Sequence, residues 1–187
     1  MTALGLRARP LSEGAVLRAA APAGALDVHP MLAALFRASG ARHRFIAHAP
    51  EGRTDAASLL RGHPLAQAAK SIVLRVAYGK RRRRYVLAVV PGDRRVDLAA
   101  VADLMGGTEA SFAVREVAER LTGCVSGSIA PFALGAAAAE LEVLVDEELT
   151  GHPALYFNTG RLDMSVELAV SDYLTLARPA VARIAQR

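Results

Sequence analysis

The sequence has little cysteine and few aromatic residues, and each scarcity argues against a particular kind of protein or binding site. The single cysteine, Cys124, cannot form an internal disulfide, which favours a reducing compartment and predicts a cytoplasmic protein. No apolar run reaches the roughly 18 residues of a membrane-spanning helix, so no membrane partner is expected. Aromatic residues make up 5% of the chain and do not alternate with its basic residues, which argues against a base-stacking platform for nucleic acid.

Motifs for the commoner kinds of chemistry are also missing. There is no Walker loop and no dinucleotide fingerprint. The five histidines are scattered without zinc spacing, so no metal and no cofactor is expected. Ser126 and Ser128 have no neighbouring base in the sequence. Cys124 is a candidate nucleophile, although a small thiol at a helix end is more often part of the core.

The length and composition of the chain are those of one folded domain. The chain has 187 residues, of which 52% are hydrophobic and 22% are charged. Residues 1–27 are rich in Ala, Arg, Gly and Pro and show no sustained periodicity, so they are expected to form a flexible N-terminal leader. The folded domain is expected to span 28–187.

Hydrophobic periodicity and turn residues predict interspersed helices and strands. Helices are expected at 30–39, 54–60, 64–70, 98–104 and 111–121, and from Tyr173 after a cap formed by Ser171 and Asp172. Strands are expected at 44–48, 71–78, 85–90, 141–145, 154–158 and 165–170. Neighbouring parallel strands must be joined by crossover connections, and the sequence has more strands than such crossovers could join. The sequence therefore predicts a mixed α/β (α+β) fold, with a curved, largely antiparallel mixed sheet wrapped by helices.

The net charge of +5 comes from one short segment between two expected strands. Removing its five cations from the 23 basic residues leaves 18, equal to the 18 acidic residues. Lys and Arg clusters bind phosphate backbones by releasing counterions. The alternative is a solvated hairpin tip whose charge prevents edge-to-edge aggregation. The candidate nucleic-acid-binding residues are Lys80, Arg81, Arg82, Arg83 and Arg84.

Lys70 is one of only two lysines among the 23 basic residues. It follows Ala68-Ala69 and precedes the apolar run that begins at Ile72, at the mouth of an expected strand. A compact ammonium with three donors fits a tight cleft in which the planar fork of arginine does not. Lys70 is therefore a candidate catalytic residue. The alternative is a lysine that snorkels from the end of a strand.

Two loops carry the other candidates. In the loop 127–132, Gly127, small residues and Pro131 predict a rigid turn whose N–H groups can hold an oxyanion or an ester carbonyl. Asn158 is the only asparagine in the chain and lies at the end of an apolar strand, before a glycine turn. Its amide can both donate to and accept from a small polar ligand. The alternatives are an ordinary strand connection for the loop and a local turn bond for Asn158.

Taken in order along the chain, these segments resemble a known family, over roughly residues 30–180. The pattern resembles the YbaK/prolyl-tRNA synthetase-associated editing-domain family. The Gly-Cys-Val and Phe-Asn-x-Gly segments are most similar to its free-standing, YeaK-like branch. The motifs are Lys70-Ser71-Ile72-Val73, Val90-Pro91-Gly92-Asp93, Leu121-Thr122-Gly123-Cys124-Val125, Gly127-x-x-x-Pro131-Phe132, Val145-Asp146-Glu147, Phe157-Asn158-Thr159-Gly160, Val166-Glu167-Leu168 and Asp172-Tyr173-Leu174.

The resemblance implies an enzyme, an aminoacyl-tRNA deacylase that acts in trans on the ester between a wrong amino acid and the terminal adenosine of tRNA. The essential lysine of the family falls on Lys70 and its Gly-x-x-x-Pro glycine on Gly127, so these two are the expected catalytic residues. Asn158 falls where relatives carry serine or histidine, at a position that helps to select the side chain being removed. The other expected substrate-binding residues are Ser128, Ile129, Ala130, Pro131 and Phe132, with Asp146 after a strand and His48 beside the pocket, where a structural role is an equal alternative.

The expected mechanism uses positioning, because no side-chain base is evident. Lys70 would anchor the ribose-phosphate or ester end, and N–H groups of 127–130 would stabilise charge on the carbonyl oxygen. Water would be activated by a backbone carbonyl or by a ribose hydroxyl of the tRNA. A pocket that rejects bulky residues by size predicts Ser, Ala or Thr as the amino acid. The expected partners are mischarged tRNA and an aminoacyl-tRNA synthetase. The alternative function is a non-catalytic module that binds tRNA or nucleotides.

Overall fold

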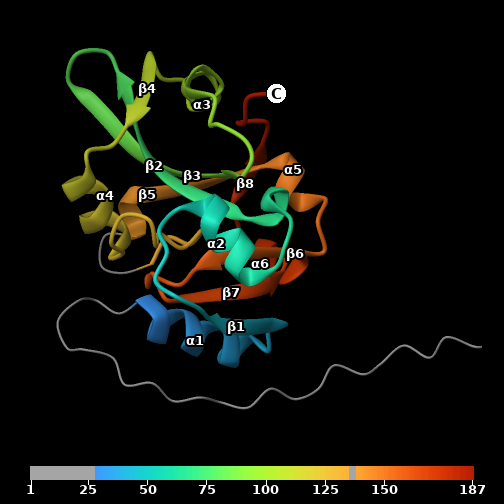
Figure 1. Ribbon diagram of the computed structural model, residues 1–187. Coiled ribbons are helices and arrows are strands. Elements are labelled where there is room, and N and C mark those ends of the chain that lie inside the picture. Colours follow the sequence, from blue (N-terminus) through green and yellow to red (C-terminus); the bar gives the residue numbers. More distant parts are fainter. Residues whose placement is uncertain (1–27, 135–137) are drawn as a thin grey trace, which may run out of the picture.

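The strands of the protein form two sheets that meet beside helix α2. The computed structural model describes residues 28–134 and 138–187, and the expected leader, 1–27, lies outside the described residues. Figure 1 shows the hairpin β2–β3 with β4 and α3 at the top, α1 and β1 at the bottom, and α2 between them. The helices are α1 (Val28–Ser39), α2 (Thr54–Arg61), α3 (Leu98–Leu104), α4 (Arg115–Thr122), α5 (Glu147–Thr150) and α6 (Val170–Ala177), with short 3-10 turns η1 (Leu65–Gln67) and η2 (Ala138–Glu140).

The sheets are mixed and mostly antiparallel, as the sequence predicted. The smaller sheet has the order β1-β7-β6 and is antiparallel throughout. The larger has the order β4-β2-β3-β5-β8, in which β5 runs parallel to both β3 and β8 and the other pairs are antiparallel. The strands are β1 (His43–Ala47), β2 (Ala69–Tyr78), β3 (Arg82–Pro91), β4 (Glu109–Phe112), β5 (Leu141–Asp146), β6 (Ala154–Asn158), β7 (Met164–Ala169) and β8 (Ala180–Ala182).

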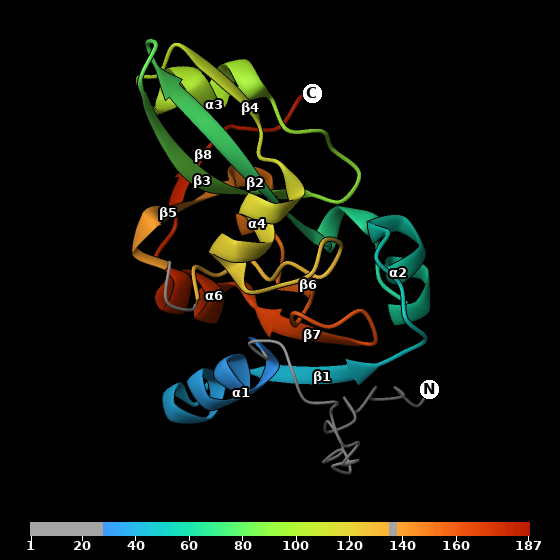
Figure 2. The same cartoon turned by 90° about the vertical axis from the view of Figure 1, so that its left-hand side faces the viewer.

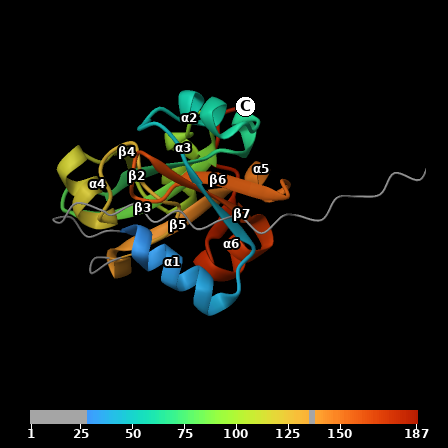
Figure 3. The same ribbon diagram turned by 60° about the horizontal axis from the view of Figure 1, so that its bottom comes forward.

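The central strand β3 is covered on both faces. Its residues from Val86 to Val90 are all fully buried, as expected for a strand between two hydrophobic layers. Leu87 and Val89 pack into a core with α1, α4 and α6, whereas Val86, Ala88 and Val90 pack into a second core with α3. Figure 3 shows the corresponding layers, with α1 and α6 on the opposite side of the strands from α2 and α3.

The two sheets are joined at the start of β2. Ala68 forms an isolated parallel bridge with Tyr156 of β6, immediately before β2 begins at Ala69. In Figure 2, α2 lies on the right, below the hairpin β2–β3 and above β1. This junction places Lys70, the second residue of β2, next to the end of the smaller sheet.

Three predicted elements are wrong in part. The helix expected to end at Lys70 is only the short turn η1, because the chain is already extended at Ala69, which pairs with Pro91. The helix expected over 111–121 begins at Arg115, because the preceding residues form strand β4 against β2. Helix α6 begins at Val170, so Asp172 lies within its first turn and does not cap it. Among the described residues, no helix is long and apolar enough to cross a membrane.

Candidate active site

A cavity of about 170 Å³ lies at the junction of the two sheets. Its lining comes from helix α2, the start of β2, the end of β6 and the two loops that contain Gly52 and Gly127. Lys70, Gly127, Ile129 and Asn158, four of the residues singled out from the sequence, are part of this lining. The fold thus brings together groups that are as much as 88 positions apart in the sequence numbering.

Lys70 is held in the cavity wall by the turn that follows β3. Its ammonium donates to the carbonyl oxygen of Gly92, at 3.3 Å, and to that of Arg94. An ammonium has three donors, so one is left for a ligand in the cavity. Burial lowers the pKa of Lys70, while the nearby Asp93 carboxylate acts in the opposite direction. The lysine is therefore a fixed, partly desolvated charge, and it does not snorkel into bulk solvent.

The turn that holds Lys70 can pack against η1 because position 92 is glycine. A Cβ atom built there would lie 2.7 Å from both the side chain and the carbonyl oxygen of Leu65, which is closer than real contacts allow. The Val-Pro-Gly-Asp motif noted in the sequence is thus the support of the lysine.

Gly127 is required by both its backbone angle and its surroundings. Its φ is +89°, a region that favours glycine, and an added Cβ would lie 3.0 Å from the Cα atom of Gly52. The N–H of Ser128 donates to the carbonyl of Val125 and is used within the turn. In the described part of the chain, the N–H groups of Gly127 and Ile129 have no backbone acceptor, so these two are the donors that a ligand oxygen can use.

Asn158 links the two loops. Its amide nitrogen donates to the carbonyl of Glu51, at 3.2 Å, and to that of Gly127, at 3.0 Å. Its amide oxygen accepts a hydrogen bond of 2.7 Å from the hydroxyl of Ser165. Asn158 is buried, and these bonds use both donors and one side of its acceptor. We call Gly52, Gly127, Ile129 and Asn158 the loop lining of the cavity.

His48 reaches this arrangement indirectly. It does not line the cavity, but its Nε2 atom lies 2.7 Å from the Ser165 hydroxyl that binds Asn158. Its Nδ1 atom lies 2.8 Å from the carbonyl of Ala49. His48 thus supports Asn158 through one intervening hydroxyl, which favours the structural alternative over contact with substrate.

Several expected substrate-binding residues do not reach the cavity. Ser128, Ala130, Pro131 and Phe132 are buried, and Phe132 packs edge-on against Tyr173 in the core. The loop therefore contributes its backbone at Gly127 and the side chain of Ile129, because the rest of it anchors the turn.

Asp146 also lies outside the cavity lining. It is fully buried and accepts hydrogen bonds from the backbone N–H groups of Glu148, Ile184 and Ala185 at 2.8 to 3.0 Å. Its carboxylate therefore caps the N-terminus of α5 and holds the C-terminal segment beside β5 by hydrogen bonds. This role is structural and corrects the expectation that Asp146 binds substrate.

Sequence reasoning missed a group of residues on α2 and β2. Thr54, Ala57 and Arg61 line the cavity at positions i, i+3 and i+7, which share one face of a helix. Arg53, which pairs with Asp55 at 2.7 Å, and Ser71 also line it. We call Arg53, Arg61, Lys70 and Ser71 the cationic lining. The helical spacing was visible in the sequence, but the direction in which that face points was not.

The chemistry of the lining is that of binding and orientation. No carboxylate, imidazole or thiol belongs to it. Cys124 is buried away from it, and burial raises the pKa of its thiol, so the alternative of core packing fits this residue. Within 28–134 and 138–187, no group of three or more His, Cys, Asp or Glu residues is placed to hold a metal ion. Donors and fixed positive charge are what this cavity offers to a ligand.

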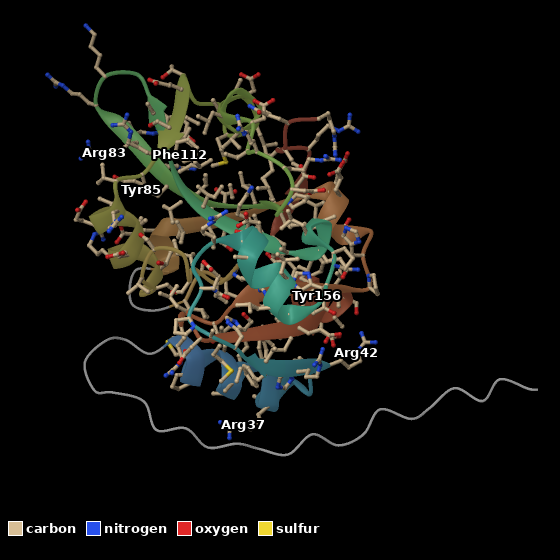
Figure 4. All side chains as sticks on the ribbon, viewed as in Figure 1. Arg37, Arg42, Arg83, Tyr85, Phe112 and Tyr156 are labelled. Atoms are coloured by element: carbon tan, nitrogen blue, oxygen red, sulfur yellow. The ribbon has the colours of Figure 1, made fainter. Side chains whose placement is uncertain are left out.

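The basic segment lies at the other end of the hairpin. Lys80 and Arg81 form its turn, while Arg82, Arg83 and Arg84 belong to β3 and are exposed. A strand rises about 3.3 Å per residue, so the end of β2 at Tyr78 is roughly 25 Å from Lys70. Figure 4 shows Arg83 near the hairpin tip, well separated from Tyr156, which lines the cavity.

Comparison with known proteins identifies the family to which this protein belongs. Residues 48–176 match the family described as the aminoacyl-tRNA editing domain, and the chain belongs to this family. The multifunctional Ser/Thr-tRNA deacylase ProXp-y of Escherichia coli (strain K12) is 38% identical over 152 residues, which cover 81% of this chain and 89% of that protein. The prolyl-tRNA editing protein ProX of Acetoanaerobium sticklandii is 30% identical over 104 residues, or 55% of this chain and 62% of that protein.

Solved structures share the fold. The crystal structure of hypothetical protein APE2540 matches with a TM-score of 0.73 and 20% identity, covering 83% of this chain and 99% of that one. A proposed trans-editing enzyme for prolyl tRNA synthetase matches with a TM-score of 0.71 and 22% identity, covering 88% of this chain and all of that one, 100%. Together with the family match, these similarities confirm the expected family, fold class and enzyme class, an aminoacyl-tRNA deacylase. The roles of individual residues stay predictions.

Proposed function

We propose that this protein removes a small amino acid, of the serine, threonine or alanine kind, from mischarged tRNA in trans. The observation that carries the proposal is that Lys70, Gly127 and Asn158, from three separate parts of the chain, line one cavity. The name of the E. coli relative, a Ser/Thr-tRNA deacylase, supports serine and threonine ahead of alanine.

The size of the cavity supports a small substrate group. Its volume of about 170 Å³ is similar to the roughly 150 Å³ of an engineered protein cavity that holds one benzene molecule. An aminoacyl group with a short side chain fits such a space, whereas the adenosine that carries it does not. The aminoacyl group therefore enters the cavity and the adenosine stays at its mouth, so that bulky side chains are rejected by size.

Each part of the lining has a role in this proposal. The third donor of the Lys70 ammonium holds the ester end of the substrate by a charge-assisted hydrogen bond. The N–H groups of Gly127 and Ile129 face the carbonyl oxygen and stabilise the negative charge that develops on it. Asn158 keeps the loop in place, because its amide is already bonded to both loops.

The reaction is the addition of water to the ester carbonyl. The tetrahedral oxyanion collapses, the bond from the carbonyl carbon to the ribose oxygen breaks, and that oxygen takes up a proton to give free tRNA and the amino acid. No side-chain base lines the cavity. We therefore assign the proton of the attacking water to a ribose hydroxyl of the tRNA or to a backbone carbonyl, and positioning supplies much of the rate.

The wider contacts belong to the same proposal. With the acceptor end in the cavity, we propose that Lys80, Arg81 and the exposed arginines of β3 bind phosphates of the acceptor stem, which their charge supports. Docking of an aminoacyl-tRNA synthetase and a cytoplasmic location stay predictions from the sequence.

The test is deacylation of a panel of mischarged tRNAs. We expect release of serine and threonine, loss of that activity in Lys70→Ala, and partial retention in Lys70→Arg, which keeps the charge but not the compact ammonium. The control is Arg37→Ala, an exposed residue of α1 that Figure 4 shows at the bottom of the molecule, apart from Tyr156 of the cavity lining. Binding without release across the whole panel would instead support the non-catalytic module.

A further inference from the structure

Arg61 is a half-buried cation, one nitrogen of which is buried without a hydrogen-bond partner. It is the last residue of α2, and its Nε atom donates to the carbonyl of Ala57 at 2.9 Å. Its Nη1 atom is buried and has no hydrogen-bond partner. Among the described residues, no carboxylate forms an ion pair with it. The guanidinium therefore lines the cavity with part of its hydrogen-bonding capacity unused.

Leaving a cation in this state is costly. A buried polar group without a hydrogen bond destabilises the folded protein, and an unpaired buried charge does so more strongly. Burial lowers the pKa of Arg61 to about 10, which still leaves the guanidinium charged at neutral pH. A group that costs stability and remains charged is typical of a binding residue whose partner arrives with the ligand.

The surroundings of Arg61 indicate the sign of that ligand. Ser71 lines the same cavity, and its hydroxyl oxygen is likewise buried without a partner. Arg53 and Lys70 add two further positive charges, and no residue of the lining is acidic. The ammonium of Lys70 already binds the carbonyls of Gly92 and Arg94, whereas Arg61 binds one carbonyl, that of Ala57, and its Nη1 atom binds none. This part of the cavity therefore favours an anion with several acceptor oxygens.

We infer that Arg61, assisted by Ser71, binds the phosphodiester group that joins the terminal adenosine of the tRNA to the preceding nucleotide. The planar guanidinium fork matches two phosphate oxygens, and a serine hydroxyl can donate to a third. Arg61 would hold the phosphate, and Lys70 would remain for the ester end of the same nucleotide. The inference rests on the proposed function, because it needs the terminal adenosine at the mouth of this cavity.

The test compares two small probes that differ only in the phosphate. Adenosine 5′-monophosphate carries the phosphate of the terminal nucleotide, and adenosine lacks it. We expect the full-length protein to bind the monophosphate more tightly by calorimetry. Arg61→Gln should weaken that binding by about 10- to 100-fold and leave adenosine unaffected. Arg61→Lys should restore part of the difference, Ser71→Ala should lose a smaller part, and the exposed Arg37→Gln should change nothing.

Thermal unfolding distinguishes binding from a structural role. Removing an unpaired buried charge should leave the melting temperature of the ligand-free protein unchanged or raised in Arg61→Gln. Adenosine 5′-monophosphate should raise the melting temperature of the wild-type protein but not that of the variant. A variant that melts at a lower temperature while binding both probes like the wild type would overturn the proposal.

The outcome separates this inference from the proposed function. If the protein releases serine from tRNA but binds the two probes equally, the phosphate site is wrong and the deacylase stands. If it prefers the monophosphate through Arg61 but releases no amino acid, the phosphate site stands and the deacylase is wrong.

Discussion

The loop lining and the cationic lining of the cavity differ in how far their polar atoms are satisfied. In the loop lining, Asn158 bonds to both loops and to Ser165, so its amide is held within the protein. In the cationic lining, the Nη1 atom of Arg61 and the hydroxyl of Ser71 are buried without partners. The side-chain amide of the first part is thus held before any ligand arrives, whereas these two side-chain groups of the second part are not.

This difference assigns the two parts different tasks. A reaction centre works best when its donors are fixed in advance, because no reorganisation is then needed as charge develops. A binding subsite can instead keep its donors unpaired, because the ligand supplies the missing acceptors. We therefore expect changes to the loop lining to act mainly on kcat and changes to Arg61 and Ser71 to act mainly on affinity. Lys70, which two carbonyls already hold, belongs with the first group.

The largest effect is expected for Gly127→Ala. The added Cβ would meet the backbone of Gly52 at 3.0 Å in a backbone region that favours glycine, so the two loops must move apart. We expect kcat for Ser-tRNA to fall about 100- to 1000-fold, as on loss of an oxyanion donor, and unfolding free energy to fall by about 1–3 kcal/mol.

Gly151→Ala is the matched control. Gly151 has a negative φ, and a Cβ there would meet only an ordinary contact at 3.5 Å. Deacylation should be unchanged. Full activity in Gly127→Ala, measured in the same assay, would remove the backbone of this loop from the mechanism.

A smaller effect is expected for Asn158→Ala. The variant leaves the carbonyls of Glu51 and Gly127 and the hydroxyl of Ser165 without their shared partner. We expect about a 10- to 100-fold loss of kcat and a destabilisation of about 1–3 kcal/mol. Because all these bonds are to protein groups, the loss should be equal for Ser-tRNA and Thr-tRNA. A changed preference would show that Asn158 selects the amino acid directly, as the family resemblance implies.

The pH dependence should report on Lys70. Burial lowers its pKa below that of an exposed lysine, so its charge is present at neutral pH and is lost as the pH rises through that lowered value. We expect the enzyme-dependent rate, corrected for spontaneous hydrolysis, to fall several-fold as the pH rises through the lowered pKa of Lys70, which lies below that of an exposed lysine. In Lys70→Arg the residual activity should persist to higher pH, since arginine keeps its charge. Identical profiles would contradict this role of the ammonium.

The smallest effect is expected at the hairpin. Arg83→Gln removes one exposed cation roughly 25 Å from the chemistry, so kcat should not change. Affinity for tRNA should fall a few-fold, and the slope of log affinity against log salt should weaken by about 1. Arg183→Gln, which removes an equal charge from an exposed site beside Glu147, should leave the slope unaltered. Equal slopes in both variants would exclude the hairpin from the tRNA interface.

The sequence predicted the elements whose local signals agree with their packing. Helix α3 was expected over 98–104 and is found at Leu98–Leu104, because Asp97 caps it and its apolar face meets a core. Strand β6 was likewise expected over 154–158 and is found there. Strand β4 was missed, because Glu109–Phe112 is extended only through its pairing with β2.

The site was predictable in its chemistry but not in its full membership. The family resemblance placed Lys70, Gly127 and Asn158 at one pocket, and the structure brings these three to one cavity. It also placed Asp146 there, because an acidic residue after a strand can be either a ligand or a buried cap, and only the fold decides. Arg61 was missed because a missing partner is a property of the folded environment and leaves no mark in the sequence.

The pairing of β2 with β3 sets a constraint on how this protein can change. The two strands match residue for residue from Ala69 opposite Pro91 to Tyr78 opposite Arg82. Since side chains alternate between faces, losing one residue from each arm would turn every side chain between that point and the tip to the opposite face. Within its packed part the hairpin can therefore be lengthened or shortened only in steps of two residues per arm, about 7 Å each, whereas its exposed tip is free of this limit. The distance from the cavity at which the tip could contact a long substrate changes in the same steps.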